Sequence, residues 1–295
     1  MSGFERHRQT GETFREDIFQ KTCKGRYGLV TGGTSGIGKY CAEFLAERQA
    51  NVIFTGRNEQ RGQEIANSSE QLRFLKLDMI DWDSFSESIK DLPKLDFVIL
   101  NAGGMPEGFQ KNSYGLESQF ASQLMGHYLL IDLLDRKGLL TSNCRIVWVT
   151  SGGMYLRKLT LDILEQDPEY NKVATYANTK RAQVILVEEL AKSDQFKKYE
   201  MNCMHPGWVD TPGVQTAIPG FREKTKNRLR DYHAGADTIL WMVLTKDKLK
   251  KGELYFDRKE QPKYSFFWTK ESPEIRSEYL RKVENYRKKF LEKNK

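Results

Sequence analysis

A tyrosine and a lysine four residues apart are the residues of this chain best suited to acid–base chemistry. They are Tyr176 and Lys180, in the segment Tyr-Ala-Asn-Thr-Lys. On a helix, positions i and i+4 lie on one face, a turn apart. A nearby ammonium favours the phenolate and lowers the pKa of a tyrosine from its usual value of about 10. The pair is therefore suited to exchange a proton with a carbonyl or alcohol oxygen while a hydride moves at carbon.

The same spacing occurs a second time, at Tyr255 and Lys259. This second pair falls in a predicted strand and the loop after it, where i and i+4 are much farther apart than on a helix. The first pair is distinguished by Ser151, which ends the apolar run 146–150. A hydroxyl at the carboxyl end of a strand can hydrogen-bond a substrate oxygen. We therefore predict that Ser151 joins the first pair in the catalytic group and that Tyr255 takes no part.

A glycine-rich segment follows directly on the first predicted strand. Its glycines at 32, 36 and 38 permit a tight turn and let the backbone approach a pyrophosphate closely. The helix that begins at once presents unpaired N–H groups to the phosphates. We predict a dinucleotide-binding loop here, with a plain turn as the alternative. Its cofactor-binding residues are Gly32, Thr34, Ser35, Gly36, Ile37 and Gly38.

The end of the second predicted strand indicates which dinucleotide binds. In a dinucleotide site this position faces the adenosine ribose, where an acidic residue would bind the 2′-hydroxyl. Here the position is Gly56, and Arg57 follows it. An arginine can hold a 2′-phosphate through two parallel hydrogen bonds, whereas an acid would repel it. The pattern favours NADP(H) over NAD(H), although Arg57 could instead be a solvated loop cation.

The elements that must position these residues alternate regularly along the chain. Several predicted strands are apolar on both faces, as in a parallel sheet covered by helices. Predicted strands are Tyr27–Thr31, Val52–Thr55, Phe74–Asp78, Phe97–Ala102, Ile146–Ser151, Met201–Pro206 and Leu254–Phe256. Helical spacing begins at Ile37 and recurs in 115–136, 175–192 and 233–244. This alternation predicts a single α/β domain with a doubly wound parallel sheet of the Rossmann type and ligands at the carboxyl ends of the strands.

Composition limits the class of protein. The chain has 295 residues, of which 39% are hydrophobic and 29% charged, as is ordinary for a globular protein. Its four cysteines form no CxxC pair, and His127 and His205 have no ligand partners at metal spacing, so no metal site is expected. No apolar run approaches the roughly 20 residues that span a bilayer, and the first residues lack the apolar core of a signal peptide. We expect a soluble protein of the cytoplasm or another reducing compartment.

Taken together, these motifs resemble the short-chain dehydrogenases/reductases over roughly residues 25–258, in order and spacing as well as type. The resemblance implies that Asp78 holds the adenine and that Asn101-Ala102-Gly103 stabilises the sheet beside the cofactor. It also implies that Pro206-Gly207 and Thr211 lie on the nicotinamide side. Ser151, Tyr176 and Lys180 match three of the family's four catalytic residues, and the latter two also contact the cofactor. The long gap from Ser151 to Tyr176 resembles the retinol-dehydrogenase-like branch.

The fourth catalytic residue of the family is an asparagine, and here its position holds Gln123. That asparagine kinks its helix and binds a water that passes protons to the lysine. Glutamine carries the same amide on a longer arm, so the relay could survive with altered geometry or be lost. The principal expectation is an NADP(H)-dependent oxidoreductase acting on a carbonyl or alcohol. The alternative is a structural or scaffolding subunit of the same fold with little or no turnover.

Three further segments complete the predicted organisation. Residues 1–24 form an N-terminal extension and residues 25–259 the catalytic domain. Residues 207–232 form a lid whose apolar content, including Trp208 and Phe221, favours an apolar or lipid-like substrate. Residues 260–295 end in a basic amphipathic helix starting at Ser272-Pro273, expected to be dispensable for chemistry.

The apolar stripe of this C-terminal helix must pack on its own domain, a second subunit, a partner protein or a membrane surface, the last being less favoured. The last fifteen residues hold seven Lys/Arg and two Glu, which is most of the net charge of +7. A basic tail of this kind is usually a solvated helix face, so nucleic-acid binding is not expected.

Overall fold

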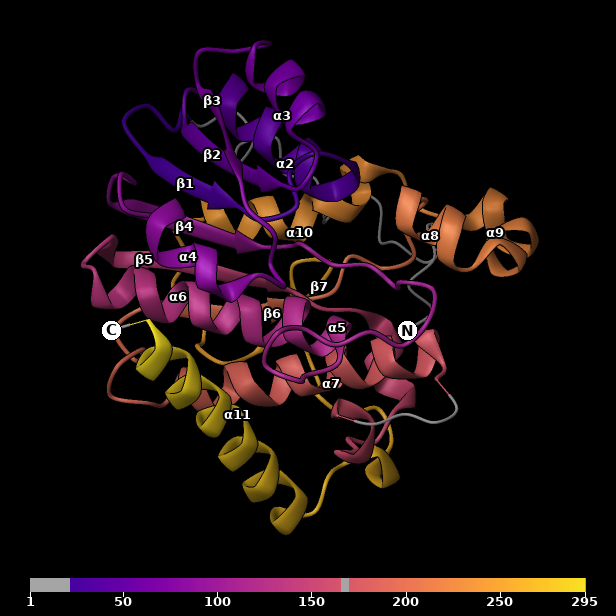
Figure 1. Cartoon of the computed structure of the whole chain (residues 1–295). Coiled ribbons are helices and arrows are strands. Elements are labelled where there is room, and N and C mark those ends of the chain that lie inside the picture. Colours follow the sequence, from indigo (N-terminus) through magenta and orange to yellow (C-terminus); the bar gives the residue numbers. More distant parts are fainter. Residues whose placement is uncertain (1–21, 166–169, 295) are drawn as a thin grey trace.

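Runs of β-branched and aromatic residues form the strands of one eight-stranded sheet in the computed structural model, which describes residues 22–165 and 170–294 (Figure 1). The strands are β1 (Tyr27–Val30), β2 (Asn51–Gly56), β3 (Leu72–Lys76), β4 (Leu95–Leu100), β5 (Leu140–Val149), β6 (Glu200–Met204), β7 (Leu254–Phe256) and β8 (Lys259–Gln261). Their order is β3-β2-β1-β4-β5-β6-β7-β8. All neighbours are parallel except β7 and β8. The order reverses direction between β1 and β4, which is where open α/β sheets bind ligands.

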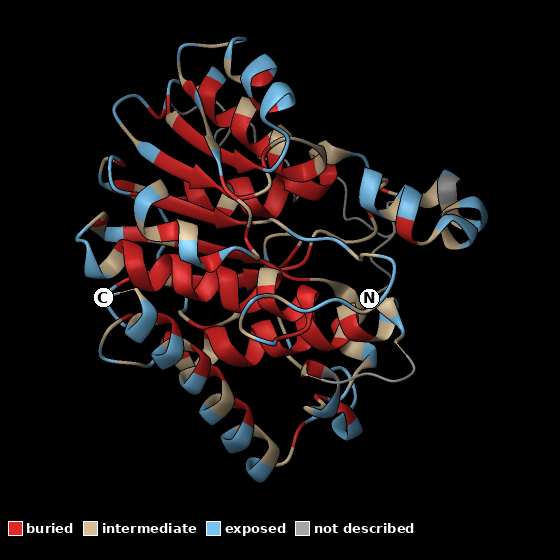
Figure 2. Ribbon diagram, viewed as in Figure 1, coloured by how far each residue is buried: buried red, intermediate tan, exposed pale blue. Residues whose placement is uncertain are grey.

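Helices cover both faces of the sheet and bury two separate apolar clusters. On one face lie α2 (Gly36–Glu47), α3 (Glu59–Ala66) and α10 (Tyr232–Leu244). On the other lie α4 (Phe85–Ser88), α5 (Ser118–Phe120), α6 (His127–Arg136) and α7 (Lys172–Leu190). Figure 2 shows the buried residues concentrated in the sheet and in the helix faces turned toward it. The predicted doubly wound α/β fold is therefore confirmed.

All seven predicted strands are present; β7 has the predicted bounds and the other six have shifted bounds. Strand β5 begins at Leu140, six residues earlier than predicted. Strand β8 was not predicted, because Lys259, Glu260 and Gln261 are polar and their turn lacks glycine. The helix predicted within 115–136 is interrupted by a π-helical segment at Ala121–Gly126, between α5 and α6. π-helical turns are rare, usually occur as single turns inside α-helices, and are frequently found at functional sites.

The segment expected to form a lid folds into two short helices, α8 (Pro212–Ala217) and α9 (Pro219–Thr225). Both extend away from the sheet (Figure 1). Asp210, just before α8, accepts hydrogen bonds from Arg222 in α9 at 2.8 and 2.9 Å, and Trp208 packs on Phe221 with ring centroids 4.6 Å apart. These contacts hold α9 against the segment that precedes α8, and they do not involve the sheet.

The C-terminal helix α11 (Pro273–Lys293) starts at the predicted residues, with the Ser272 hydroxyl accepting from the Ile275 N–H. Its apolar stripe is buried against α5, α6 and α7 of the same chain, in the larger apolar cluster. The buried side chains are those of Tyr279, Val283, Tyr286 and Phe290. An association through α11 would therefore have to use its charged outer face.

Among the described helices, none is long and apolar enough to cross a membrane. No group of histidine, cysteine and acidic side chains that could hold a metal ion occurs in residues 22–165 and 170–294.

Candidate functional site

The predicted site residues converge at the carboxyl edge of the sheet. The glycine loop follows β1, Arg57 follows β2, Asp78 follows β3, Asn101 follows β4 and Ser151 follows β5. Pro206 and Gly207 follow β6 in the same way. Because these six strands are parallel, their ends meet at one edge. Tyr176 and Lys180 reach it from α7, and Gln123 reaches it from the π-helical segment.

The glycine loop needs glycine for two reasons: close packing at Gly32 and a positive φ at both Gly32 and Gly36. A Cβ on Gly32, whose φ is +68°, would lie 2.8 Å from the Ala102 Cα. A Cβ on Gly36, whose φ is +56°, would point toward Thr211, 3.8 Å away. The loop is therefore framed by Ala102 on one side and by Thr211 on the other. Ser35 precedes α2 without capping it, so the first N–H groups of the helix have no side-chain partner.

Thr31 joins the glycine loop to the segment after β4. Its hydroxyl oxygen accepts hydrogen bonds from the N–H groups of Asn101 and Ala102, at 2.9 and 3.0 Å. Both lone pairs are then used, so its hydrogen is donated to His127 Nε2 at 3.0 Å. The Ile99 carbonyl is farther, at 3.4 Å. His127 was not expected to contribute here, and its contact with the end of β1 was not visible in the sequence.

Burial lowers the pKa of His127 to about 3, assisted by the charge of Lys180. The ring is therefore neutral at ordinary pH. A neutral imidazole has one nitrogen that accepts, as the contact with Thr31 requires. The two observations agree on one protonation state.

Arg57 is exposed at the end of β2 and pairs with no acid among the described residues. The preceding Gly56 lies against Thr34 of the glycine loop, where a Cβ would approach the Thr34 Cγ2 to 2.5 Å. The Arg57 side chain thus starts beside the glycine loop with its guanidinium free. Asp78 is partly buried, and its Oδ1 accepts from the Ile80 N–H at 3.2 Å, which fixes the turn after β3.

Ser151, Tyr176 and Lys180 are brought together as predicted. The Lys180 Nζ donates to the Val149 carbonyl at 3.0 Å and lies 5.3 Å from the centre of the Tyr176 ring. The Ser151 side chain hydrogen-bonds Tyr176 and also accepts from the Gly153 N–H at 3.2 Å. A helix and a strand end that are 25 residues apart therefore present two hydroxyls and an ammonium to one point.

The pKa of Tyr176 moves in the direction opposite to that predicted. Burial raises the pKa of Tyr176 to about 12, and the hydrogen bond with Ser151 offsets only part of this change. Burial also lowers the pKa of Lys180 to about 7. Loss of water around the two groups is the largest cause of both shifts, because each charged form is poorly solvated here. The site therefore favours a protonated Tyr176 at neutral pH.

Gln123 is buried, but its side chain is turned toward the loop after β4. The Nε2 donates to the Gly104 carbonyl at 2.7 Å. The main-chain carbonyl of Gln123 accepts from Gln183 of α7 at 2.7 Å. None of the contacts recorded for residues 22–165 and 170–294 joins Gln123 to Lys180.

His205 was assigned no role from the sequence, yet it lies immediately beside the catalytic strand end. Its ring is buried, is stacked on Phe256 with centroids 4.1 Å apart, and meets the edge of Tyr155 at 6.0 Å. A Cβ on Gly152, next to Ser151, would lie 3.7 Å from it. Neither ring nitrogen has a partner among the described residues. Burial and the charge of Arg230 lower its pKa to about 3.

Tyr255 lies within β7 and is buried, as expected. It packs on Trp241 at 5.8 Å, and its hydroxyl lies 3.5 Å from the Lys250 carbonyl. None of the catalytic candidates contacts it in the described part of the chain.

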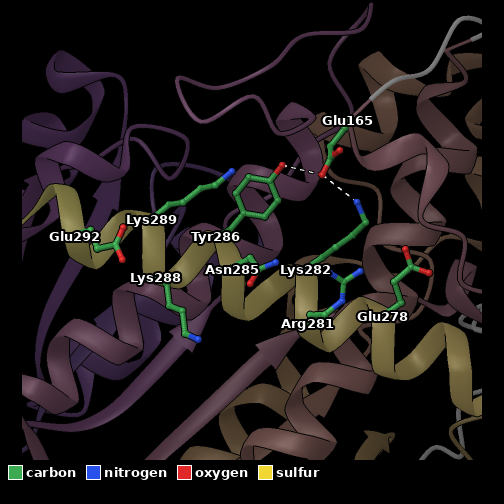
Figure 3. Close-up of a pocket in the computed structure, with 9 residues that line it drawn as sticks. All are labelled: Glu165, Glu278, Arg281, Lys282, Asn285, Tyr286, Lys288, Lys289 and Glu292. Carbon is green, nitrogen blue, oxygen red and sulfur yellow. Dashed lines mark hydrogen bonds and ion pairs between the residues drawn. The ribbon is translucent and has the colours of Figure 1, made fainter.

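A separate hollow lies on the outer side of α11 and contains none of the predicted site residues (Figure 3). Lys282 and Tyr286 both point to the Glu165 carboxylate, at 3.1 and 3.0 Å. Most of the remaining lining consists of charged side chains of one helix face, so this hollow offers no arrangement for acid–base chemistry.

Two comparisons with known proteins show the family, and a third supports the fold. The short chain dehydrogenase family model matches residues 27–220, well over half of the chain. Dehydrogenase/reductase SDR family member 12 of Homo sapiens is 37% identical over 252 residues, covering 80% of this chain and 77% of that protein. Polyprenol dehydrogenase of Homo sapiens is 30% identical over 215 residues, covering 67% of this chain and 64% of that protein.

A solved short chain dehydrogenase of Shigella flexneri, complexed with NADP, superposes with a TM-score of 0.63. It is 22% identical and covers 81% of this chain and 100% of that chain, so it supports the fold. The glycine loop, the Ser–Tyr–Lys group and the matched length lead to one conclusion: the chain belongs to the short-chain dehydrogenase/reductase family of oxidoreductases.

Proposed function

We propose that this protein is an NADP(H)-dependent oxidoreductase that interconverts an apolar carbonyl compound and its alcohol. The observation that carries the proposal is the meeting of Ser151, Tyr176 and Lys180 at the sheet edge that also holds the glycine loop. Membership of the family supports a nicotinamide cofactor, and Gly56-Arg57 supports the phosphorylated form of it.

The residues present fit such a cofactor. Gly32, Thr34, Ser35, Gly36, Ile37 and Gly38 would hold the pyrophosphate, because the glycines leave room for it and the start of α2 has no side-chain cap. Arg57 would bind the 2′-phosphate and Asp78 the adenine. Asn101, Ala102 and Gly103 would line the middle of the cofactor. Pro206, Gly207 and Thr211 would meet the nicotinamide end. When bound, the cofactor would donate a hydride to the carbonyl carbon in reduction and accept one from the alcohol carbon in oxidation.

The catalytic steps assigned to the protein are proton transfers. Ser151 would orient the substrate oxygen, and Tyr176 would give it a proton during carbonyl reduction. The raised pKa of Tyr176 favours this direction, because the hydroxyl is protonated at neutral pH. Lys180, held by the Val149 carbonyl, would stabilise the phenolate that remains. Gln123 would act as a positioning residue that fixes the Gly104 carbonyl and the π-helical segment.

The substrate is proposed to be apolar on two grounds. Trp208 and Phe221 pack together in the lid segment. A 30% identical relative carries the name of polyprenol dehydrogenase, and a polyprenol is an apolar alcohol. Both observations favour a lipid-like carbonyl or alcohol over a sugar or an organic acid.

The test is turnover of NADPH with a panel of carbonyl substrates, followed at the nicotinamide absorbance. Tyr176→Phe removes the transferable proton and keeps the ring, so turnover should fall roughly 10²–10⁴-fold while NADPH binding is retained. Tyr255→Phe, the matched control with the same sequence spacing, should leave turnover unchanged. Tight NADPH binding without turnover on any substrate would favour the alternative of a structural subunit. That alternative rests on Gln123, which stands where the family has a catalytic asparagine.

A further inference from the structure

His205, the residue directly before Pro206 and Gly207, keeps both of its ring nitrogens unpaired inside the protein. Only 3% of the residue is exposed, and neither nitrogen has a hydrogen-bond partner among the described residues. A neutral imidazole carries one donor and one acceptor. Buried polar groups are nearly always paired, because an unpaired one destabilises the folded protein. A partner from outside the chain would satisfy this ring.

The other buried histidine of the described chain, His127, provides a comparison. Burial lowers the pKa of both rings to about 3, so both are neutral at ordinary pH. The Nε2 of His127 hydrogen-bonds the Thr31 hydroxyl at 3.0 Å, whereas His205 has no such bond in residues 22–165 and 170–294. The two residues therefore differ in hydrogen bonding and not in charge. His127 serves the glycine loop, and His205 keeps its whole hydrogen-bonding capacity for a ligand.

Two aromatic rings hold the imidazole of His205 without using its nitrogens. Phe256 of β7 lies parallel to it, with centroids 4.1 Å apart and an angle of 11° between the planes. Tyr155 meets it at 88°, with centroids 6.0 Å apart, and is itself fixed by donating to the Pro262 carbonyl at 2.8 Å. The ring is therefore oriented before any ligand binds. A group that is oriented in advance loses less entropy when a ligand binds to it.

The edge of the ring that carries Nδ1 faces the backbone beside the candidate catalytic serine. A Cβ on Gly152 would lie 3.7 Å from both Nδ1 and Cε1 of His205. Gly152 directly follows Ser151, and consecutive Cα atoms are about 3.8 Å apart. Gly152 also has no side chain that could cover this edge. A ligand whose oxygen is held by Ser151 and Tyr176 is therefore only a few bonds away from Nδ1.

We propose that His205 is a substrate-binding residue that selects carbonyl compounds with a second oxygen a few bonds from the reacting carbonyl. Its Nδ1 donates a hydrogen bond to this second oxygen, while Ser151 and Tyr176 hold the first. The preferred substrates are then diketones or hydroxyketones on an otherwise apolar chain. The inference rests on the proposed function, because the proposed catalytic group places the first oxygen.

The experiment compares kcat/KM for a medium-chain methyl ketone with kcat/KM for the α- and β-diketones of the same chain length, using NADPH. The ratio of diketone to ketone is measured in each protein, so the unequal reactivity of the substrates cancels between variant and wild type. His205→Phe keeps an aromatic ring on Phe256 and removes both nitrogens, so the ratio should fall about tenfold to hundredfold. His205→Asn places an amide near the position of Nδ1 and should retain most of the ratio. His233→Asn, which removes a histidine of α10, is the matched control and should keep the wild-type ratio.

Two further measurements make the result independent of folding and of turnover. The midpoint of urea unfolding should not fall in His205→Phe, because the variant removes two unpaired buried atoms. The imidazole ¹⁵N resonances of His205 are followed as the α-diketone is added to the wild type holding NADP⁺, in which no reduction can occur. They should shift with the diketone and not with the methyl ketone. The chain has four histidines, and the signals lost in His205→Asn assign the resonances.

An unchanged ratio in His205→Phe, or His205 resonances that do not move with the diketone, would overturn the proposal. Equal losses on ketone and diketones together with weaker NADPH binding would assign Nδ1 to the carboxamide of the nicotinamide, and would also overturn it. Shifted resonances without turnover of any carbonyl would refute the proposed function but not the role of His205 in binding. Turnover with an unchanged ratio would do the reverse.

Discussion

The Thr31 hydroxyl has one hydrogen and two lone pairs, and its neighbours use all three. Two N–H groups from the segment after β4 donate to it, and it donates to His127. Protonation of His127 would replace the acceptor with a second donor and break this arrangement. The geometry of the glycine loop therefore depends on the protonation state of a residue that makes no predicted contact with cofactor or substrate.

This dependence predicts how stability changes with pH. Burial lowers the pKa of His127 to about 3, whereas the unfolded side chain has a pKa of about 6.5. Between pH about 6.5 and about 3, His127 binds a proton in the unfolded chain but not in the folded chain. The free energy of unfolding should therefore fall by about 1.4 kcal/mol per pH unit between pH about 6.5 and about 3 for this residue. His205 has the same shift and adds a similar dependence.

His127→Gln keeps an acceptor for the Thr31 hydroxyl and cannot titrate. Urea unfolding at several pH values should show a shallower decline in the variant than in the wild type. Parallel declines would mean that His127 is protonated in the folded protein, against the hydrogen bonding described above.

The proposed preference for NADPH over NADH also rests on one residue. Arg57→Ala should weaken NADPH binding about tenfold to hundredfold and leave NADH binding nearly unchanged, because only NADPH carries the 2′-phosphate. Arg61→Ala, an exposed arginine in α3, is the control. Titration of both cofactors into both variants measures this, and an equal loss for NADPH and NADH in Arg57→Ala would refute the assignment.

The sequence predicts those parts of the candidate site whose residues lie close together in the chain at a characteristic spacing. Tyr176, Lys180 and the glycine loop were found in this way, because each motif is local. His127 and His205 were missed because their partners, Thr31 and Phe256, are remote in sequence. The direction of the Tyr176 pKa was wrong for a related reason: desolvation depends on what covers a side chain, and spacing along one helix does not contain that information.

At the scale of elements, the β7–β8 hairpin turns through two residues that are not glycine. Asp257 and Arg258 have φ values of +47° and +57°, a conformation that usually costs L-residues energy. Each is held by an ion pair with two hydrogen bonds. Asp257 accepts from Arg230 at 2.7 and 2.9 Å, and Arg258 donates to Asp237 of α10 at 2.5 and 3.0 Å.

These two ion pairs explain why β8 was not predicted. Hairpins with this geometry usually carry Asn-Gly or Asp-Gly, and that signal is absent. The ion pairs replace it, and their partners, Arg230 and Asp237, lie more than twenty residues away in sequence. The π-helical turn at Ala121–Gly126 was missed similarly, since an added residue in a helical turn leaves no pattern in the sequence.

Burial should decide how much such an ion pair contributes to the free energy of unfolding. Asp257→Asn keeps a residue that tolerates positive φ but leaves the buried Arg230 without its carboxylate, so the free energy of unfolding should fall by on the order of 3 kcal/mol. Asp210→Asn breaks a pair of the same geometry with Arg222 that is about one-third exposed, and should cost less than about 1 kcal/mol. Denaturant unfolding of both variants measures the difference. Equal losses would mean that burial does not distinguish the two pairs.

At the scale of the whole molecule, α11 contributes to the core although it follows every predicted motif. It inserts four side chains into the larger apolar cluster, and Arg287 pairs at 3.0 Å with Asp132 of α6, which is fully buried. Burying four such side chains is worth roughly 6–12 kcal/mol, comparable to the whole stability of an ordinary domain. The predicted boundary between residues 25–259 and 260–295 therefore marks where the motifs end. We expect that residues 25–259 do not fold stably without α11.

The proposal that α11 is dispensable for chemistry can be tested without removing it. Phe290→Ala creates a cavity at the far end of the helix and should lower the free energy of unfolding by about 3–5 kcal/mol. Turnover per folded molecule should not change, because Phe290 contacts none of the candidate catalytic residues among the described contacts. Loss of turnover in the folded fraction would show that α11 shapes the active site.

The position of α11 also has a consequence for synthesis on the ribosome. Lys293 contacts Asp83 across 210 residues of chain, and Tyr286 contacts Glu165 across 121. The nascent chain can form β1 to β6 and the glycine loop well before residue 290 is made, but the apolar faces of α6 and α7 remain uncovered until then. During that interval the newly made protein exposes the surface that most invites aggregation, so we expect chaperones to bind it there and to leave when α11 docks.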